Sequence, residues 1–432
     1  MRLSYPRLSA YALGAFGTGV FSTVPTVLLL YFCTETLAMP PALAAAAVFL
    51  PKLWAVVWDP MVGIWSDRTR TCIGRRRPFL LAGGAGVSLA FLALFAWPYP
   101  MGAGAFPVVA AIYFLLANTY SLFAVPFIAT PAEISDDAAE RERVTAWRIG
   151  FGMVGVLIGA GLAPMLVRLG GGGREGYAVM ALVVAAICGV GMLSAFLATP
   201  SAPAAKVSRA APLRQALPAL LGQRPFLKLA AAYVLQLTGV GVVSAITPYW
   251  IVHVAGRSEA DVGVALGLML IVTIVSTPLW AWIVRRFGAL PAIAAAALIY
   301  GAATLSFLAI PASPALPGLV LYALIGLPFA GLQVGPFALA AHLTHEAARM
   351  NGANQEGLFT GVWTAGEKLG LAMGPGAAGL GLALVGFHSG APMQSPAALR
   401  GLTVLLAAGP TLFLWLSLPL LWARPVRLEA LA

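Results

Sequence analysis

Long apolar stretches recur along the chain at nearly regular intervals, and short polar segments separate them. Each stretch has about 20 residues or more with very few charged side chains, the length that an α-helix needs to cross the hydrocarbon core of a membrane. The pattern therefore predicts twelve membrane-spanning helices. Their expected bounds are 9–34, 43–65, 78–97, 106–129, 147–168, 177–199, 227–252, 262–284, 290–310, 317–341, 357–385 and 399–422.

The basic residues give these helices an orientation. If both ends of the chain are cytoplasmic, the cytoplasmic segments hold 20 of the 26 Lys and Arg residues, whereas the outer segments hold four. The other two, Lys52 and Lys368, lie inside predicted spans. Because cytoplasmic loops are enriched in Lys and Arg, we expect a multi-pass protein of the cytoplasmic (inner) membrane with both termini in the cytoplasm. The basic, then apolar N-terminus is interpreted as the first helix and not as a cleaved signal peptide.

Composition agrees with a membrane protein and argues against other classes. Of the 432 residues, 60% are hydrophobic and only 9% are charged, and the mean hydropathy is +0.90. The net charge of +11 is spread over loops without a stacked aromatic and basic surface, so we expect no nucleic-acid partner. The three cysteines match no metal or redox spacing, and we expect no metal site. Without a nucleophile–base set or a phosphate loop, the sequence does not predict an enzyme.

The chain divides into two similar halves. A stretch rich in Pro, Ala and basic residues follows the sixth predicted helix and predicts a cytoplasmic linker at 200–226, between domains 1–199 and 227–432. After both the second and the eighth predicted helix, a proline-containing helix end leads into arginines and a glycine. Parallel half-repeats of this kind build the major facilitator fold, an all-α membrane fold of two six-helix halves with a binding site near the midplane.

Several sequence blocks resemble one transporter family. They are DPMVGIWSDRTRTCIGRRRPFLL from Asp59, PFIATPAEISDDAAERERVTAWR from Pro126, NQEGLFTGVWTAGEKLG ending at Gly370, and GAFG with YFCTE in the first helix. At these positions along the chain they resemble the glycoside–pentoside–hexuronide:cation symporters, the melibiose-permease branch of the major facilitator superfamily. The resemblance covers the whole chain and implies a secondary active transporter that works by alternating access.

The resemblance also implies positions for the charged groups of the site. In melibiose permease, carboxylates on helices one and four hold the sugar, and two on helix two hold the cation. The matching positions here are Gly19, Ala124, Ala55 and Asp59. Because only Asp59 keeps a carboxylate, the sugar site differs from that of the permease, and both H+ and Na+ stay open as the coupling ion.

Asp59 is also a strong candidate from the residues alone, because an ionised carboxylate inside the hydrocarbon region is costly unless it is paired or solvated. Lys52 lies seven residues earlier, on the same helical face. Ser121 stands where the family has a threonine near the cation. We expect these three residues to form the cation-coupling site. A purely structural ion pair of Asp59 stays open as the alternative.

A second group of residues is expected to bind the substrate. The resemblance implies positions at or beside the sugar for Arg148, Trp363, Thr364 and Lys368. From the residues alone, Tyr120 offers a ring on which a sugar can stack, and Glu367 is a second protonatable group inside a predicted span. Packing, membrane anchoring and ion pairing between helices are the alternative roles for these side chains.

The segment after the second predicted helix has the signature of a cytoplasmic gate. Its residues are Gly63, Asp67, Arg68, Arg75, Arg76 and Arg77. An arginine paired with Asp67 can latch the cytoplasmic side of such a transporter, and Gly63 allows a close approach of two helices. The alternative is that the arginines only set the topology.

These features predict cation-coupled symport, with H+ or Na+, of a glycoside or a related small polar solute. We expect a functional monomer without a cofactor, whose partners are the solute and the lipid bilayer. The alternatives are a transporter of an amphiphile such as a lysolipid, an exporter of a hydrophobic compound, and a membrane assembly factor that transports nothing. The absence of carboxylates at Gly19, Ala55 and Ala124 makes the cavity less polar, which suits an acyl chain.

Overall fold

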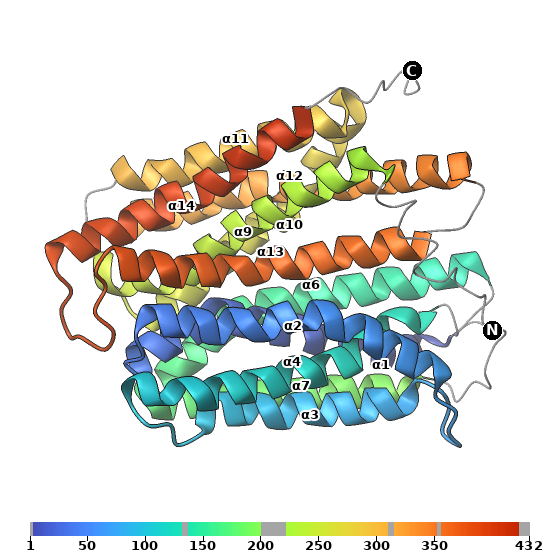
Figure 1. Ribbon diagram of the computed structural model, residues 1–432, viewed down its shortest axis with the longest axis horizontal. Helices are drawn as coiled ribbons and strands as arrows, with labels where there is room; N and C mark the ends of the chain where they lie inside the picture. Colours follow the sequence, from blue (N-terminus) through green and yellow to red (C-terminus); the bar gives the residue numbers. More distant parts are fainter. Residues whose placement is uncertain (1–2, 132–136, 200–221, 310–314, 352–355, 423–432) are drawn as a thin grey trace. The chain divides into compact units, whose positions relative to one another are not determined.

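Twelve long helices make up most of the residues that the structure describes (Figure 1). The structure is a computed structural model that describes residues 3–131, 137–199, 222–309, 315–351 and 356–422. No β-strand occurs in these ranges, so the predicted all-α architecture is confirmed. The helices are α1 (Tyr5–Val24), α2 (Pro41–Arg68), α3 (Arg77–Ala96), α4 (Phe106–Ala129), α6 (Ala138–Leu169), α7 (Gly173–Ala198), α9 (Arg224–Tyr249), α10 (Glu259–Phe287), α11 (Ala289–Leu305), α12 (Ala315–Asn351), α13 (Glu356–Leu384) and α14 (Pro396–Trp422).

The predicted spans coincide with these helices one by one. Eleven helices in the described ranges are long and apolar enough to cross a membrane. The twelfth, α13, has 29 residues, but its many glycines and the adjacent Glu367 and Lys368 lower its hydropathy. The hydropathy pattern therefore predicts the number and the order of the long helices correctly.

Helix α6 begins earlier than the sequence pattern predicts. It starts at Ala138 and not near residue 147, because the Asp137 carboxylate caps the first turn by accepting a main-chain N–H at 3.1 Å. Glu140 and Arg143 then pair along the helix at 3.1 Å. Residues 138–146, which include the charged residues 140–143, are therefore helical, and Arg148 lies well inside α6 instead of at its start.

Wide turns follow the first helix of each six-helix run. The π-helical turns η1 (Pro25–Leu29) and η2 (Phe32–Thr36) come after α1, and η4 (Trp250–Val254) comes after α9. Proline has no N–H to donate, so Pro25 in η1 and Pro248 just before η4 each remove one α-helical hydrogen bond. The apolar pattern continues through these turns, and hydropathy alone therefore predicts uninterrupted spans.

Contacts divide the chain into two compact units. The first comprises Met1–Val207, Arg257–Gly267 and Gly386–Gln394, and the second comprises Ser208–Gly256, Leu268–Val385 and Ser395–Ala432. Most of the predicted linker 200–226 lies outside the described residues, at 200–221. The domain boundaries 1–199 and 227–432 therefore stay a prediction.

The two units use the same helix pairings. In the first unit, α1 packs on α6 and α7, and α3 packs on α4 and α7. In the second unit, α9 packs on α13 and α14, and α11 packs on α12 and α14. These are equivalent positions in two runs of six helices, as expected for a duplicated helical bundle.

Glycines bring the first helix of each run into backbone contact with the fifth. A Cβ atom added at Gly19 on α1 would collide with the main chain of α6, and one added at Gly155 on α6 would collide with the main chain of Phe16. In the second unit, a Cβ atom added at Gly241 on α9 would lie 3.0 Å from the Cα atom of Gly374 on α13. Small residues at such crossings let helices approach closely in a membrane.

The contact of α1 with α6 can be tested with two alanine substitutions on α6. Gly155→Ala should lower the free energy of unfolding by about 1–3 kcal/mol, because the added methyl group overpacks the contact with α1. Gly150→Ala is the matched control, since its Cβ would meet no atom within 4 Å. Thermal unfolding of the purified proteins in one detergent measures both, and equal midpoints would contradict the tight crossing.

Candidate functional site

The first unit contains a cavity of about 190 Å³ between α1, α4 and α6. It is lined by Ala15 and Thr18 from α1, by Tyr120, Ala124, Phe127 and Ile128 from α4, and by Arg148, Ile149 and Gly152 from α6. On each helix these residues are adjacent or three to four positions apart, so they share one face. The structure thus brings together two of the predicted substrate-binding residues, Tyr120 and Arg148.

Arg148 is the one charged residue among those that line the cavity. Its side chain is half-buried, and its Nε atom is buried without a hydrogen-bond partner in the described part of the chain. The walls around it are mostly apolar, and none of the lining residues has a carboxylate. Because a guanidinium group has five N–H donors and no acceptor, the cavity suits a ligand group that accepts hydrogen bonds, and an anionic group most strongly.

Tyr120 supplies the aromatic part of the cavity wall. Its ring stacks on Phe21 of α1, with the ring centroids 4.4 Å apart and an interplanar angle of 28°. One helical turn further along α4, Ala124 also lines the cavity and is only 3% exposed. The family resemblance places a sugar-binding carboxylate at Ala124, so this part of the wall is apolar where the permease has a charge.

Gly19, the other position for a sugar-binding carboxylate, is not among the lining residues. It lies against the main chain of α6, where even a methyl group would collide. A carboxylate at this position would require α1 and α6 to move apart. The helix crossing therefore gives a physical reason for a glycine at this position.

The three predicted cation-coupling residues come from α2 and α4. Lys52 Nζ donates a hydrogen bond to Thr26 Oγ1 of η1 at 3.4 Å. Asp59 is half-buried, and its Oδ1 atom is fully buried. Ser121 is 1% exposed, and its hydroxyl donates to the Ala117 carbonyl of its own helix at 3.1 Å. A coupling role for these residues stays a prediction.

Two tryptophans fix the rotation of α2 against α4. The indole N–H of Trp54 donates to Asn118 Oδ1 at 3.1 Å, and that of Trp58 donates to the Asn118 carbonyl at 3.3 Å. Asp59 directly follows Trp58 in the helix, so its direction is set by this contact. Asn118 was not predicted as a site residue, although it is a polar residue inside an apolar span.

Arg76 connects three helices at the end of the predicted gate. Its Nη2 atom lies 3.4 Å from Asp67 Oδ1, and its Nη1 atom donates to the Pro126 carbonyl of α4 at 3.0 Å. Arg76 is 8% exposed, whereas the Asp67 side chain is 51% exposed. The guanidinium of Arg77 lies over the ring of Phe196 on α7, 4.6 Å from its centroid. Both arginines therefore make specific contacts with other helices, in addition to any role in setting the topology.

The remaining predicted gating residues include Gly63, Arg68 and Arg75. Arg68 is exposed, and Arg75 is half-buried with a buried Nη1 atom. A Cβ atom added at Gly63 would lie 3.6 Å from Val125, which is an ordinary contact distance. The close helix approach that we expected at Gly63 is therefore not seen, and the tight crossings lie at other glycines.

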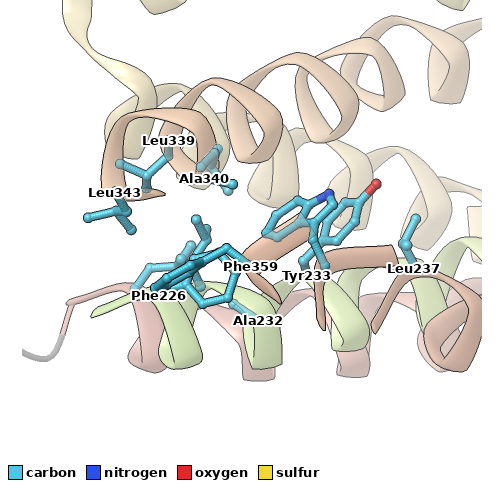
Figure 2. Packing of buried hydrophobic residues seen from close by; sticks show 12 residues of the cluster. Phe226, Ala232, Tyr233, Leu237, Leu339, Ala340, Leu343 and Phe359 are labelled. Atoms are coloured by element: carbon cyan, nitrogen blue, oxygen red, sulfur yellow. The ribbon is translucent and has the colours of Figure 1, made fainter. Parts of the chain in front are cut away.

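Trp363 lies in a buried apolar cluster of the second unit. Figure 2 shows this cluster, with Phe226, Tyr233 and Phe359 among its labelled residues. Its ring stacks on Tyr233 of α9, with centroids 4.5 Å apart and an interplanar angle of 10°. Phe226 and Phe359 belong to the same cluster. The indole Nε1 atom of Trp363 has no hydrogen-bond partner among the described residues. The ring therefore has a clear packing role, and its N–H is a buried donor.

Three polar residues that were predicted to bind the substrate follow Trp363 on its helix. Thr364, Glu367 and Lys368 follow Trp363 on α13, and all three are half-buried. The Tyr233 hydroxyl donates to Gln333 Oε1 of α12 at 3.4 Å. Because α9 and α12 are far apart in the chain, no local sequence signal predicts the pair of Tyr233 and Gln333.

Sequence reasoning also missed most of the cavity wall in the first unit. Thr18 is a polar residue on the same face of α1 as Tyr11 and Ala15, because the three are spaced by four and three positions. That spacing could have identified Thr18. Phe127, Ile128 and Ile149 look like ordinary lipid-facing or core residues, and only the way in which α1, α4 and α6 surround one cavity shows that they line it.

Comparisons with known proteins agree on one family. The chain matches the family described as MFS/sugar transport protein over residues 10–427. It is 25% identical to YagG of Escherichia coli (strain K12), named a glycoside/cation symporter, over 98% of this chain and 93% of the relative. It is 24% identical to the sphingosine-1-phosphate transporter MFSD2B of Mus musculus, over 98% of this chain and 90% of the relative.

Solved structures share the fold. A bacterial homologue of the human lysosomal transporter Spinster, in an inward-facing and occupied conformation, matches with a TM-score of 0.77 and 13% identity, covering 96% of this chain and 95% of that one. The nucleoside transporter NupG (D323A mutant) matches with a TM-score of 0.71 and 12% identity, covering 96% and 99%. At these identities the likeness concerns the fold alone.

Proposed function

Because the chain belongs to the MFS/sugar transport protein family, we propose that it moves a glycoside or a related small polar solute by cation-coupled symport. It is a multi-pass membrane transporter and not an enzyme. The observation that carries the choice of solute is the cavity that Arg148 and Tyr120 share. A hydroxyl or anionic group of the solute would bind the guanidinium, and its apolar face would lie on the ring.

The two halves, 1–199 and 227–432, would rock about a central site while the linker 200–226 connects them. Both termini would be in the cytoplasm of a cell whose inner membrane holds the protein, and each monomer would work alone. The distribution of Lys and Arg supports this orientation. Thr364, Glu367, Lys368 and the Trp363 N–H would supply the second half's contacts to the solute.

The coupling ion would bind at Asp59, with Lys52 and Ser121 beside it. A single carboxylate can carry a proton, or it can contribute one ligand to Na+. The names of relatives support coupling to a cation, since YagG is named a glycoside/cation symporter. By linkage, the ion and the solute would each raise the affinity for the other.

One observation favours a second candidate, a transporter of an anionic or zwitterionic amphiphile. Ala124, Phe127, Ile128 and Ile149 make the walls around Arg148 apolar, so an acyl chain could lie beside a head group bound by the guanidinium. The relatives include a sodium-dependent lysophosphatidylcholine symporter of Danio rerio, 21% identical over 96% of this chain and 85% of the relative. Binding of lysophosphatidylcholine, but of no glycoside, to the purified protein would favour this candidate.

Removing the charge of Arg148 should weaken solute binding. A thermal-shift screen of neutral glycosides, hexuronides and lysophosphatidylcholine first identifies the compounds that bind the wild type. Arg148→Gln should then lower the affinity by about 10- to 100-fold, because a hydrogen bond to a charged group is lost. Arg141→Gln, at an exposed position of the same helix, is the control and should bind normally. Unchanged affinity of Arg148→Gln would contradict the assignment of this cavity.

Asp59→Asn should separate transport from coupling. The amide cannot carry a proton and binds Na+ more weakly, so cation-driven accumulation in proteoliposomes should be lost while solute exchange continues in part. Glu142→Gln replaces an exposed carboxylate and should accumulate solute like the wild type. Full accumulation by Asp59→Asn under an H+ or Na+ gradient would show that Asp59 is not the coupling site.

A further inference from the structure

Side chains of other helices hold the last turn of α4. Pro126 has no N–H, so the carbonyl four residues earlier receives no helical hydrogen bond from it. Arg76 Nη1 donates to the Pro126 carbonyl at 3.0 Å, and Thr130 Oγ1 donates to the same atom at 2.8 Å. The Tyr11 hydroxyl donates to the Phe127 carbonyl at 2.8 Å. The carbonyl end of a helix attracts such donors and cations. Here Tyr11 of α1 and Arg76, just before α3, supply them from outside the helix, and Thr130 is the C-cap residue of α4 itself.

The same turn forms one wall of the cavity. Phe127 and Ile128 line it together with Arg148. The ring of Phe127 packs on the ring of Tyr11, with centroids 4.7 Å apart. On the α1 side the ring is enclosed, since a Cβ atom added at Gly14 would lie 3.1 Å from it. A group that fills the cavity therefore presses on Phe127, whose ring and carbonyl both contact Tyr11.

Arg76 continues this connection to the cytoplasmic segment 69–76 between α2 and α3. Its guanidinium binds the Pro126 carbonyl and also pairs with Asp67. Helix α3, which follows Arg76, is in backbone contact with α4, because Gly83 lies against the main chain of Phe123. A displacement of the end of α4 must therefore be shared by segment 69–76.

We propose that Tyr11 and Arg76 make the end of α4 a rigid link, which couples occupancy of the cavity to the position of segment 69–76. Tyr11 is a positioning residue, since it acts through Phe127 and is not among the cavity's lining residues. The inference rests on the proposed function only in treating the cavity as part of the solute site. Because coupling is reciprocal, a change in the Asp67–Arg76 pair would also change the affinity of the cavity.

The native cysteines allow a test without any solute. Cys72 is exposed within segment 69–76, whereas Cys33 and Cys188 are buried. Thr18→Phe fills the cavity from α1, and Ile149→Phe fills it from α6. In the purified full-length protein, each filling should change the rate at which a maleimide alkylates Cys72 by about fivefold or more, the size typical of coupled sites. Adding Tyr11→Phe, which keeps the ring and removes the hydroxyl, should abolish most of that change.

Two control variants accompany the test. Tyr5→Phe removes a hydroxyl from an exposed position of the same helix and should leave the response intact, and Cys72→Ser gives the background rate. Thermal unfolding confirms that each variant is folded. If one of the two cavity-filling variants does not fold, the other is enough for the test, because the two substitutions lie on different helices. A filling that leaves the alkylation rate unchanged, or that changes it equally with and without the Tyr11 hydroxyl, would overturn the proposal. No solute or ion gradient is used, so this outcome is independent of the binding test on Arg148.

Discussion

The backbone contact between α1 and α6 is the constraint on which the rest of the first unit depends. Gly19 and Gly155 bring the two main chains so close that no side chain fits between them. The cavity therefore opens beside this crossing, and its one charged lining residue, Arg148, comes from α6. Gly241 and Gly374 make the equivalent contact between α9 and α13 in the second unit. The duplicated bundle uses the same kind of close crossing twice.

The residues that line this cavity include one positively charged side chain and no negatively charged one. Arg148 offers donors to a ligand, and no carboxylate lines the cavity to neutralise it. The positions at which the family resemblance places carboxylates are filled by the α6 main chain at Gly19 and by a methyl group at Ala124. A neutral acceptor group of a solute could accept hydrogen bonds from the Arg148 guanidinium, and an anionic group would also balance its positive charge. Phe127 is both a wall residue and a hydrogen-bond partner of Tyr11, so under the proposed coupling a group that fills the cavity would also act on the end of α4 that Tyr11 and Arg76 hold.

The sequence predicts the long helices well, because the thickness of a membrane imposes the length and the hydropathy of each span. It does not predict that α6 starts at Ala138, since the cap at Asp137 and the pair of Glu140 with Arg143 are local polar contacts that hydropathy ignores. Charged and aromatic residues of the site, such as Arg148, can be found from residue type and family resemblance. The apolar walls cannot, because they depend on how three helices that are distant in sequence pack together.

The most direct test is the relative affinity of the purified protein for phenyl β-D-glucuronide and phenyl β-D-glucoside, two ligands that differ in one carboxylate. Because no carboxylate is among the residues that line the cavity with Arg148, the wild type should bind the glucuronide more tightly than the glucoside. Ala124→Asp places a carboxylate in the same cavity and should remove or reverse that preference. Ala124→Asn adds a neutral side chain of nearly the same shape as aspartate and should keep the preference. Equal affinity of the wild type for both ligands, or a preference that Ala124→Asp leaves unchanged, would contradict the account.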